Sequence, residues 1–358
     1  MLRTIDIDLQ YQQTIPGPPP REGDLYRKAA AGDKSTIGHW KDTWEKNFKD
    51  AKDHFGELGS KSFGQLHGIN RHKPAIVIGS GPSLKHSMEA LKENRGSPSP
   101  VLSISALHNF GYFEDEGCHA DYYLSLDSGG VVIDDVSETR NQDGKFYWEK
   151  TKGKTLLAYA ASDPRLWELW QGDIYLFNTL VPDPEVRKMK DKVEVFTHYI
   201  SCGGNALGAC MYAAKAVMGS SAIMYVGADF AFDYDNTFHS YKTQYDNPGR
   251  YITAVDVFGN TRKTWQSYMN FKYWFDHVAC NVPGSWVNCS EGLMGAYREG
   301  NIQQYEYKSL HDALIPYESA DVLFLEEKKA NGESLSRTPF NLADFWANPK
   351  NDKNVTFF

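Results

Sequence analysis

The sequence predicts an α/β fold: a Rossmann-like, doubly wound and mostly parallel sheet with helices on both faces and a lid-like excursion after the sixth strand. Short, continuously apolar runs such as 75–79 and 222–226 alternate with helical patterns. Such runs are typical of parallel strands that are buried on both faces. Asp127 and Asp229 each follow a predicted strand, at the edge of the sheet where ligands bind in folds of this kind.

Composition limits the classes of protein that fit. The chain has 358 residues, of which 41% are hydrophobic and 23% charged, which excludes a largely disordered chain. The net charge of −8 argues against general duplex nucleic-acid binding. No apolar run reaches the roughly 18 residues of a membrane span. Five scattered cysteines without a C-x-x-C pair are typical of a reduced, cytoplasmic protein.

Four segments are predicted along the chain. Residues 1–35 are expected to form an extended arm, because their clustered prolines fix φ and lack amide donors. Residues 36–70 are expected to form an N-terminal helical segment, since apolar residues recur there at three- and four-residue spacing. Residues 71–315 then form the Rossmann-like domain, and residues 316–358 form a polar tail.

Within residues 71–315 the pattern predicts each element in turn. Strands are expected at 75–79, 101–105, 122–126, 155–159, 174–177 and 222–226, with a short strand at 286–288. Helices are expected at 83–94, 203–218, 263–280 and 305–315. Residues 230–262 are polar, aromatic and turn-rich, and a long irregular excursion inside an α/β domain is usually a lid or binding loop.

The turn after the first strand is the most informative segment. It consists of Gly79, Ser80, Gly81, Pro82 and Ser83. Its glycines allow close approach of a ligand, and free amides at the start of a helix attract anions. The pattern is neither G-x-G-x-x-G nor a P-loop. We expect it to hold a nucleotide phosphate; the alternative is a tight turn without a ligand.

Two aspartates and a second glycine turn converge on the same edge. Asp127 or Asp229 could bind a ribose hydroxyl, hold Mg²⁺ or act as a base; the alternative is a helix cap or a surface carboxylate. Gly203, Gly204 and Asn205 begin a predicted helix. They leave room for a ligand, or they simply allow the helix to pack closely on the sheet.

The excursion and the last short strand supply further candidate residues. His239 lies in the excursion near Tyr241, where it could act as a general base while the tyrosine binds phosphate. An ordinary loop histidine is the alternative. Glu291 adds a carboxylate at a turn after the short strand. We therefore take His239, Asp229 and Glu291 as the catalytic candidates.

The order of these motifs resembles the MptE-like domain family. That family includes archaeal 6-hydroxymethylpterin diphosphokinases and the central domain of the Maf motility-associated glycosyltransferases. In its first motif and fold it is also similar to bacterial CMP-sialic-acid-dependent sialyltransferases. The resemblance covers roughly residues 40–310 and is carried by GSGPSL (79–84), YYLSLD (122–127), SCGGNA (201–206), VGADFAF (226–232), VDVFGN (255–260) and NCSEG (288–292).

This sequence departs from the family pattern in three motifs. Asn205 replaces the serine that usually follows the glycine pair, and Leu293 replaces the second glycine of Thr-Glu-Gly-Gly. Ala228 stands where the family has a glutamine before the aspartate. The loss of that amide could change which base or sugar is recognised.

The resemblance implies a nucleotide-dependent transferase, most directly a glycosyltransferase. A CMP- or UDP-linked sugar would be the donor and a hydroxyl-bearing molecule the acceptor. Ser105 and Asp127 would contact the ribose or base, and Tyr241 the phosphate. His239 would deprotonate the acceptor, while the excursion closes over the site.

Two alternatives remain open at this point. A pyrophosphokinase would bind ATP at the same edge, with Mg²⁺ held by Asp127 and Asp229. It requires that the two carboxylates lie within reach of one metal ion. A non-catalytic nucleotide- or glycan-binding module would keep the fold without the chemistry. Chains of this family are compact, which also suggests that the protein forms a homo-oligomer.

Overall fold

The structure of the chain is a computed structural model. It describes residues 20–57, 61–137, 146–179, 184–192, 198–200, 202–240, 251–282, 284–295 and 305–315. The expectations for residues 1–19 of the arm, for the tail at 316–358 and for Tyr241 fall outside the described residues.

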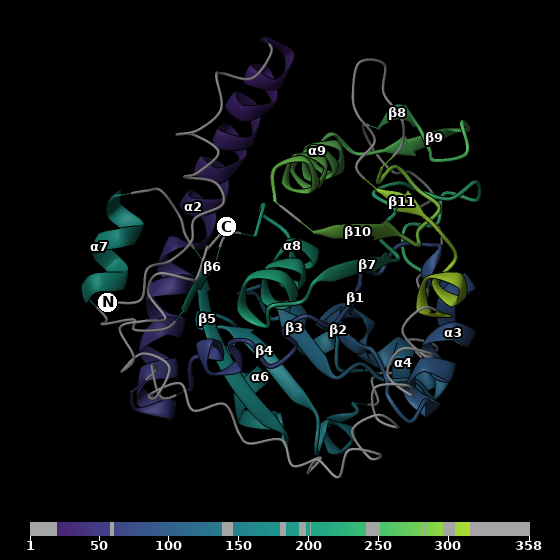
Figure 1. Cartoon of the computed structure of the whole chain (residues 1–358). Helices are drawn as coiled ribbons and strands as arrows, with labels where there is room; N and C mark the ends of the chain where they lie inside the picture. The colour runs from purple at the N-terminus through teal and green to yellow at the C-terminus, as the bar shows by residue number, and fades with distance from the viewer. Residues whose placement is uncertain are drawn as a thin grey trace, which may run out of the picture.

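A nine-stranded parallel sheet forms the centre of the molecule (Figure 1). Its strand order is β11-β10-β7-β1-β2-β3-β4-β5-β6, and every pairing within it is parallel. The strands are β1 (Ala75–Ile78), β2 (Leu102–Ala106), β3 (Tyr122–Ser125), β4 (Thr155–Tyr159), β5 (Asp173–Thr179), β6 (His198–Ile200), β7 (Ala222–Val226), β10 (Ser285–Asn288) and β11 (Glu306–Tyr307). The predicted Rossmann-like fold class is confirmed.

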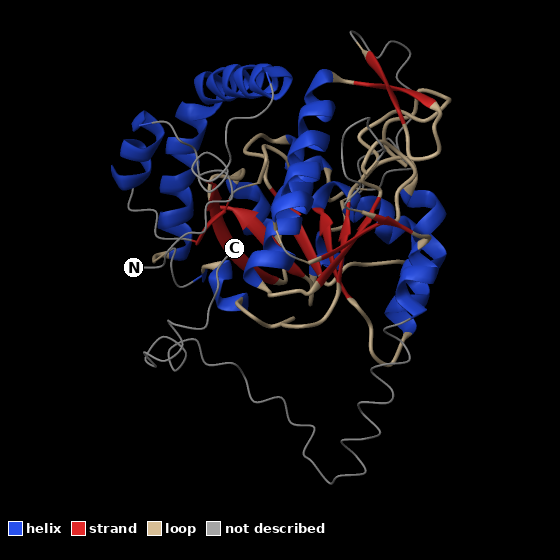
Figure 2. Cartoon of the chain, turned by 45° about the horizontal axis from the view of Figure 1, so that its top comes forward, coloured by secondary structure: helices blue, strands red, loops and turns tan. Residues whose placement is uncertain are grey.

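Helices flank this sheet on both faces (Figures 1 and 2). Strands β1 to β6 progress in one direction across the sheet, whereas β7 returns to the other side of β1. Right-handed crossovers therefore place α3, α4 and α6 on one face and α8 and α9 on the other. The helix bounds are α2 (Pro20–Phe55), α3 (Leu84–Gly96), α4 (Phe110–Glu116), α5 (Val131–Asp134), α6 (Pro164–Leu169), α7 (Pro184–Lys192), α8 (Ala206–Tyr212) and α9 (Gln266–Asn281).

The hydrophobic core lies between the sheet and these helices. Strand β1 is buried along its whole length, because it occupies the middle of the sheet and is covered on both faces. Helix α2 closes one end of the core: Trp44 and Phe48 pack edge-on against the ring of Tyr159 in β4. This packing fixes α2 beside the carboxyl ends of β3 and β4, where Trp44 Nε1 donates a hydrogen bond to Ser128 Oγ.

Several elements differ from the sequence prediction. Helix α2 begins at Pro20, so the extended arm predicted for residues 1–35 is wrong from that point on. Proline is well tolerated in a first helical turn, where its missing amide costs little. Strands β6 and β11 were not predicted, because two or three residues at a sheet edge carry too short a pattern, and the start of the helix expected at 305–315 is wrong because β11 lies there. The helix expected at 203–218 is divided into α8 and a π-helical turn, Ala213–Val217.

The predicted excursion contains a second, small sheet. Strands β8 (Ile252–Val255) and β9 (Thr261–Thr264) form an antiparallel hairpin, which stands apart from the main sheet in Figure 2. Residues 241–250 fall outside the described residues, and a role as a lid stays a prediction. Among the described residues, no helix is long and apolar enough to cross a membrane.

A buried lysine makes the stability of the fold depend on pH. Lys190 of α7 donates a hydrogen bond of 2.5 Å to the carbonyl of Thr179 and lies over the ring of Phe48. Burial lowers its pKa from 10.5 to about 7. The folded state therefore binds this proton less tightly than the unfolded state, and stability falls as the pH drops from about 10 to about 7.

We expect Lys190→Met to remove this pH dependence. The variant should gain stability relative to the parent chain at pH 6.5 and lose that advantage at pH 10. Urea unfolding at both pH values measures the difference, in which all other titrating groups cancel. Equal pH profiles for the two chains would contradict the assignment.

Candidate functional site

The turns after β1, β7 and β10 meet at the carboxyl edge of the sheet, where the direction of strand progression changes. Asp229, just after β7, joins them. Its Oδ2 accepts hydrogen bonds from the amide of Ser83 at 2.9 Å and from Ser83 Oγ at 3.0 Å. Its Oδ1 accepts one from the amide of Glu291 at 3.2 Å. A single carboxylate thus links three strand ends.

Close packing around Asp229 explains the glycines on either side. A Cβ on Gly81 would overlap Asp229 Oδ2, and one on Gly292 would overlap the Asp229 backbone. Asp229 is only 4% exposed. Burial raises its pKa, while the hydrogen bonds from Ser83 and Glu291 oppose that shift. The positive N-terminal end of α3 also favours a carboxylate at this place.

This arrangement bears on the predicted phosphate site at Gly79–Ser83. The amide of Gly81 donates to the carbonyl of Gly227 at 2.8 Å, and the amide of Ser83 donates to Asp229. Two of the amides expected to bind phosphate are therefore engaged within the chain. A tight structural turn accounts for both bonds, and phosphate binding at Gly79, Ser80, Gly81, Pro82 and Ser83 stays a prediction.

A small pocket of about 210 Å³ opens beside Asp229. Glu291 lies in it and pairs with His86 of α3, with 2.7 Å between Oε1 and Nδ1. Lys85 lies 3.7 Å from Asp233 in the same pocket. The predicted carboxylates Asp229 and Glu291 are thus brought together, and a lysine and a histidine from the first turn of α3 accompany them.

His239 lies on the other side of the β1 turn. Its Nδ1 is 3.4 Å from the carbonyl oxygen of Ser80, and the amide of Ser240 donates to the same oxygen at 3.2 Å. The ring of His239 meets the ring of His108 edge-on, with 4.7 Å between centroids. Strand topology therefore carries His239 to the predicted edge, next to a second imidazole.

His108 and Asp135 were missed by the sequence analysis. His108 follows β2 in a short 3₁₀ turn, and its Nδ1 lies 2.6 Å from Asp135 Oδ1. A carboxylate at Nδ1 fixes the tautomer with the proton on that nitrogen, so Nε2 becomes the basic atom. The signal in the sequence was a histidine three residues after the end of a predicted strand. Its partner is 27 residues away and could not be identified from spacing.

Ser105, predicted to read a nucleotide, is fully buried in β2. Its Oγ accepts a hydrogen bond of 3.0 Å from Asn109 Nδ2, which also donates to the carbonyl of Gly79. These bonds tie the end of β2 to the turn after β1. Contact between Ser105 and a ligand stays a prediction, and the visible role of this side chain is to position the edge.

Asp127 and Asp229 are not neighbours. They follow β3 and β7, which β1 and β2 separate, so three strand spacings, about 14 Å, lie between them. Asp127 Oδ1 instead accepts a hydrogen bond from the amide of Gly129. The described residues contain no group of three or more His, Cys, Asp or Glu side chains that could hold a metal ion. These two carboxylates therefore do not fit a shared Mg²⁺ ion.

The second glycine turn lies at the start of α8, near the turn after β1. Gly203 and Gly204 have positive φ, and Gly203 packs so closely on Trp274 that a Cβ would overlap the indole. Asn205 caps α8, with Oδ1 accepting from the amide of Gly208 at 2.8 Å. Helix packing explains all three residues, and ligand binding by them stays a prediction.

The parallel sheet, its switch point and the polar residues gathered there define a Rossmann-like α/β domain. Residues 45–235, more than half of the chain, match the family described as "6-hydroxymethylpterin diphosphokinase MptE-like". The chain belongs to the MptE-like family, as the motif series indicated.

Several solved structures match this chain, and one of them shares the fold over three quarters of its length. It is the Maf glycosyltransferase from Magnetospirillum magneticum AMB-1, with a TM-score of 0.51 and 15% sequence identity. The match covers 75% of this chain and 41% of the Maf chain, so this chain spans well under half the length of that neighbour. A search of curated protein sequences finds no match.

Substitution of Asp229 tests its linking role. We expect Asp229→Asn to lower the free energy of unfolding by about 1–3 kcal/mol, because an amide nitrogen cannot accept the buried hydrogen bonds from Ser83 or Glu291. Chemical denaturation measures this loss. The matched control is Asp235→Asn, at an exposed aspartate of the same segment. Equal losses in the two variants would contradict the role.

Proposed function

We propose that the chain is a glycosyltransferase that uses a nucleotide-activated sugar, CMP- or UDP-linked, and transfers the sugar to an acceptor hydroxyl. The observation that carries this proposal is the pair of imidazoles at the carboxyl edge beside the switch point. His108, His239 and Asp135 come from three different loops. Such a convergence suits proton abstraction at the edge where these folds bind ligands.

In the proposed reaction the acceptor oxygen attacks the anomeric carbon of the donor. The new carbon–oxygen bond forms as the bond to the nucleotide phosphate breaks, and the nucleotide leaves with that electron pair. His239 takes the proton of the attacking hydroxyl at Nε2, while its Nδ1 faces the carbonyl of Ser80. His108, held by Asp135, lies in edge contact with His239 and supports the transfer.

Asp229 and Glu291 take different parts in this proposal. Asp229 is buried and bonded to Ser83 and Glu291, so it acts as a positioning residue for the turns around the donor. Glu291 faces the pocket beside Asp229 and is paired with His86. In the proposal, Glu291 contributes a hydrogen-bond acceptor for a donor hydroxyl.

The second candidate is an ATP- and Mg²⁺-dependent diphosphokinase, which the family description favours. Mg²⁺ would supply charge neutralisation at the transferred phosphoryl group. Because Asp127 and Asp229 end non-adjacent strands, the predicted pair does not supply its site. The third candidate is a non-catalytic nucleotide- or glycan-binding module. It would bind a ligand at the carboxyl edge of the sheet without catalysing a reaction.

Thermal shift against CMP, UDP, ADP and ATP, each with and without Mg²⁺, separates these candidates. A ligand that binds only the native state raises the melting temperature by mass action. We expect a shift with CMP or UDP that does not need Mg²⁺. A shift confined to ATP with Mg²⁺ would replace the proposal by the diphosphokinase, and no shift with any nucleotide would overturn it.

Substitution of the histidines tests the proton transfer. With the donor identified by thermal shift, we expect His239→Ala to lower kcat by about 10²–10⁴-fold. Asp135→Asn should lower kcat less, because His108 loses the carboxylate that fixes its tautomer. The control is His311→Gln, at an exposed histidine near the end of the described chain. The assay is release of free nucleotide, and unchanged kcat in His239→Ala would contradict the role.

A further inference from the structure

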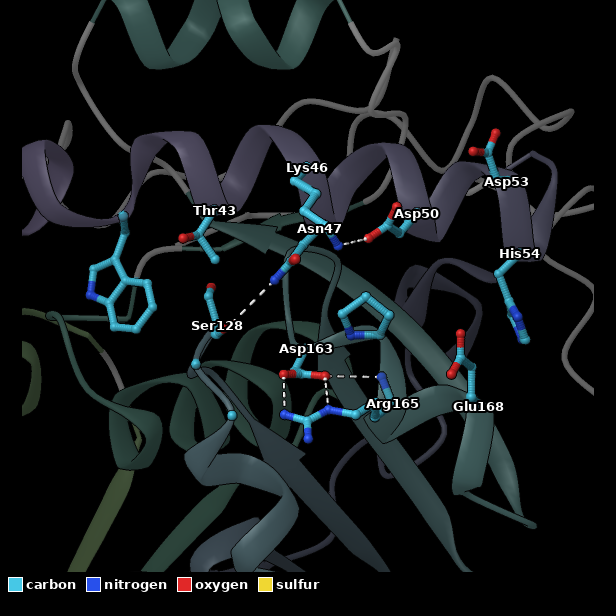
Figure 3. A pocket seen from close by; sticks show the side chains of 14 residues that line it. Thr43, Lys46, Asn47, Asp50, Asp53, His54, Ser128, Asp163, Arg165 and Glu168 are labelled. Atoms are coloured by element: carbon cyan, nitrogen blue, oxygen red, sulfur yellow. Dashed lines mark hydrogen bonds and ion pairs between the residues drawn. The ribbon is translucent and has the colours of Figure 1, made fainter.

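A second cavity in the described part of the chain lies away from the Asp229 pocket. It is a cleft of about 940 Å³ between α2 and the carboxyl ends of β3 and β4 (Figure 3). Helix α2 forms one wall, and the segment after β3 together with the start of α6 forms the other. Its volume is in the upper part of the range of small-molecule sites, about 300–1,000 Å³.

The centre of the cleft is built from side chains that the protein already holds in place. Asn47 is 4% exposed, and its amide donates to the carbonyls of Ser128 and Ala161. Asp163 binds the guanidinium of Arg165 through two hydrogen bonds, of 2.9 and 2.8 Å. That pairing lowers the pKa of the Asp163 carboxyl. The floor is therefore polar, and an ion pair forms part of it.

Carboxylates outnumber the lysine and arginine side chains that line the cleft. Lys46 pairs with Asp50 at 2.6 Å, and Arg165 pairs with Asp163. Two further carboxylates, Asp53 and Glu168, line the same cleft. Four carboxylates thus face two permanent cations.

The remaining surfaces suit a ligand rich in hydroxyl groups. Trp40 contributes an aromatic ring, which packs so closely on Gly129 that a Cβ there would come within 2.8 Å of it. Aromatic rings bind the apolar faces of sugars, and carboxylates accept hydrogen bonds from sugar hydroxyls. Apart from Trp40 and Pro164 the lining is polar, which does not suit a lipid or a flat apolar ring.

We propose that this cleft binds a neutral carbohydrate, the acceptor of the transfer reaction. The identification as acceptor rests on the proposed function; the ligand chemistry rests on the cleft itself. Its β3 wall continues through Gly130 into α5 and then to Asp135, which pairs with His108. Because β3 is the neighbour of β2, the β3 side of the cleft and the turn that carries His108 follow adjacent strands.

The binding experiment uses the full chain and an array of neutral glycans, followed by calorimetric titration of the best-bound oligosaccharide. We expect Trp40→Leu to weaken binding about tenfold, since one aromatic contact contributes up to about 1.5 kcal/mol. Trp40→Phe should restore most of the affinity. Glu168→Gln should weaken binding, whereas Glu89→Gln, at an exposed glutamate of α3, should leave it unchanged.

The competing outcomes are distinct. Binding of spermidine in place of glycans, with strong dependence on salt, would show a cation site and overturn the proposal. Absence of glycan binding, or binding unaffected by both Trp40→Leu and Glu168→Gln, would also overturn it. The thermal shift with CMP or UDP, repeated on Trp40→Leu, reports separately on the donor. If nucleotides still shift the melting temperature but no glycan binds, only the proposed glycan site in the cleft is refuted. If a glycan binds but no nucleotide shifts the melting temperature, only the proposed transferase activity is refuted.

Discussion

The carboxyl edge of this sheet is organised by one buried carboxylate. Asp229 accepts hydrogen bonds from Ser83 and Glu291 and so connects the turns that follow β1, β7 and β10. The positive end of α3 stabilises the chain's own charge at this place. Glycines at 81 and 292 are required because any side chain there would overlap Asp229. The turn after β1, which was expected to hold a nucleotide phosphate, therefore uses the amides of Gly81 and Ser83 for hydrogen bonds within the chain.

With the switch point joined in this way, the polar residues of the edge fall into three groups along the sheet. The Asp229 pocket lies over β10, β7 and β1. The imidazoles of His108 and His239 lie over β1 and β2, and the large cleft lies over β3 and β4 beside α2. In the account proposed here, the donor occupies the first two groups and the acceptor reaches them from the third. The sheet itself sets their order, because parallel strands end at one edge.

The sequence predicted most of the strands and their common edge, because buried parallel strands are continuous apolar runs. It placed Asp127 and Asp229 at that edge through the strand that precedes each, and it named Glu291 and His239 as further candidates. The sequence could not predict the contacts between the turns at this edge, because partners such as Ser83 and Asp229 are 146 residues apart. His108 and Asp135 were missed because only the turn after β2 and the short helix α5 bring them together. The cleft was missed because it requires α2 to dock beside β3, and its residues carry no local motif.

The central claim is that a nucleotide binds over the ends of β1 and β2, against the two imidazoles. Hydrogen–deuterium exchange with and without saturating CMP or UDP tests it most directly, since bound ligand slows exchange of the amides that it covers. The account predicts slower exchange in the segments after β2 and β7, residues 106–110 and 236–240, with exchange along α2 unchanged. Slower exchange confined to α2 and the start of α6, with residues 106–110 and 236–240 unaffected, would contradict it.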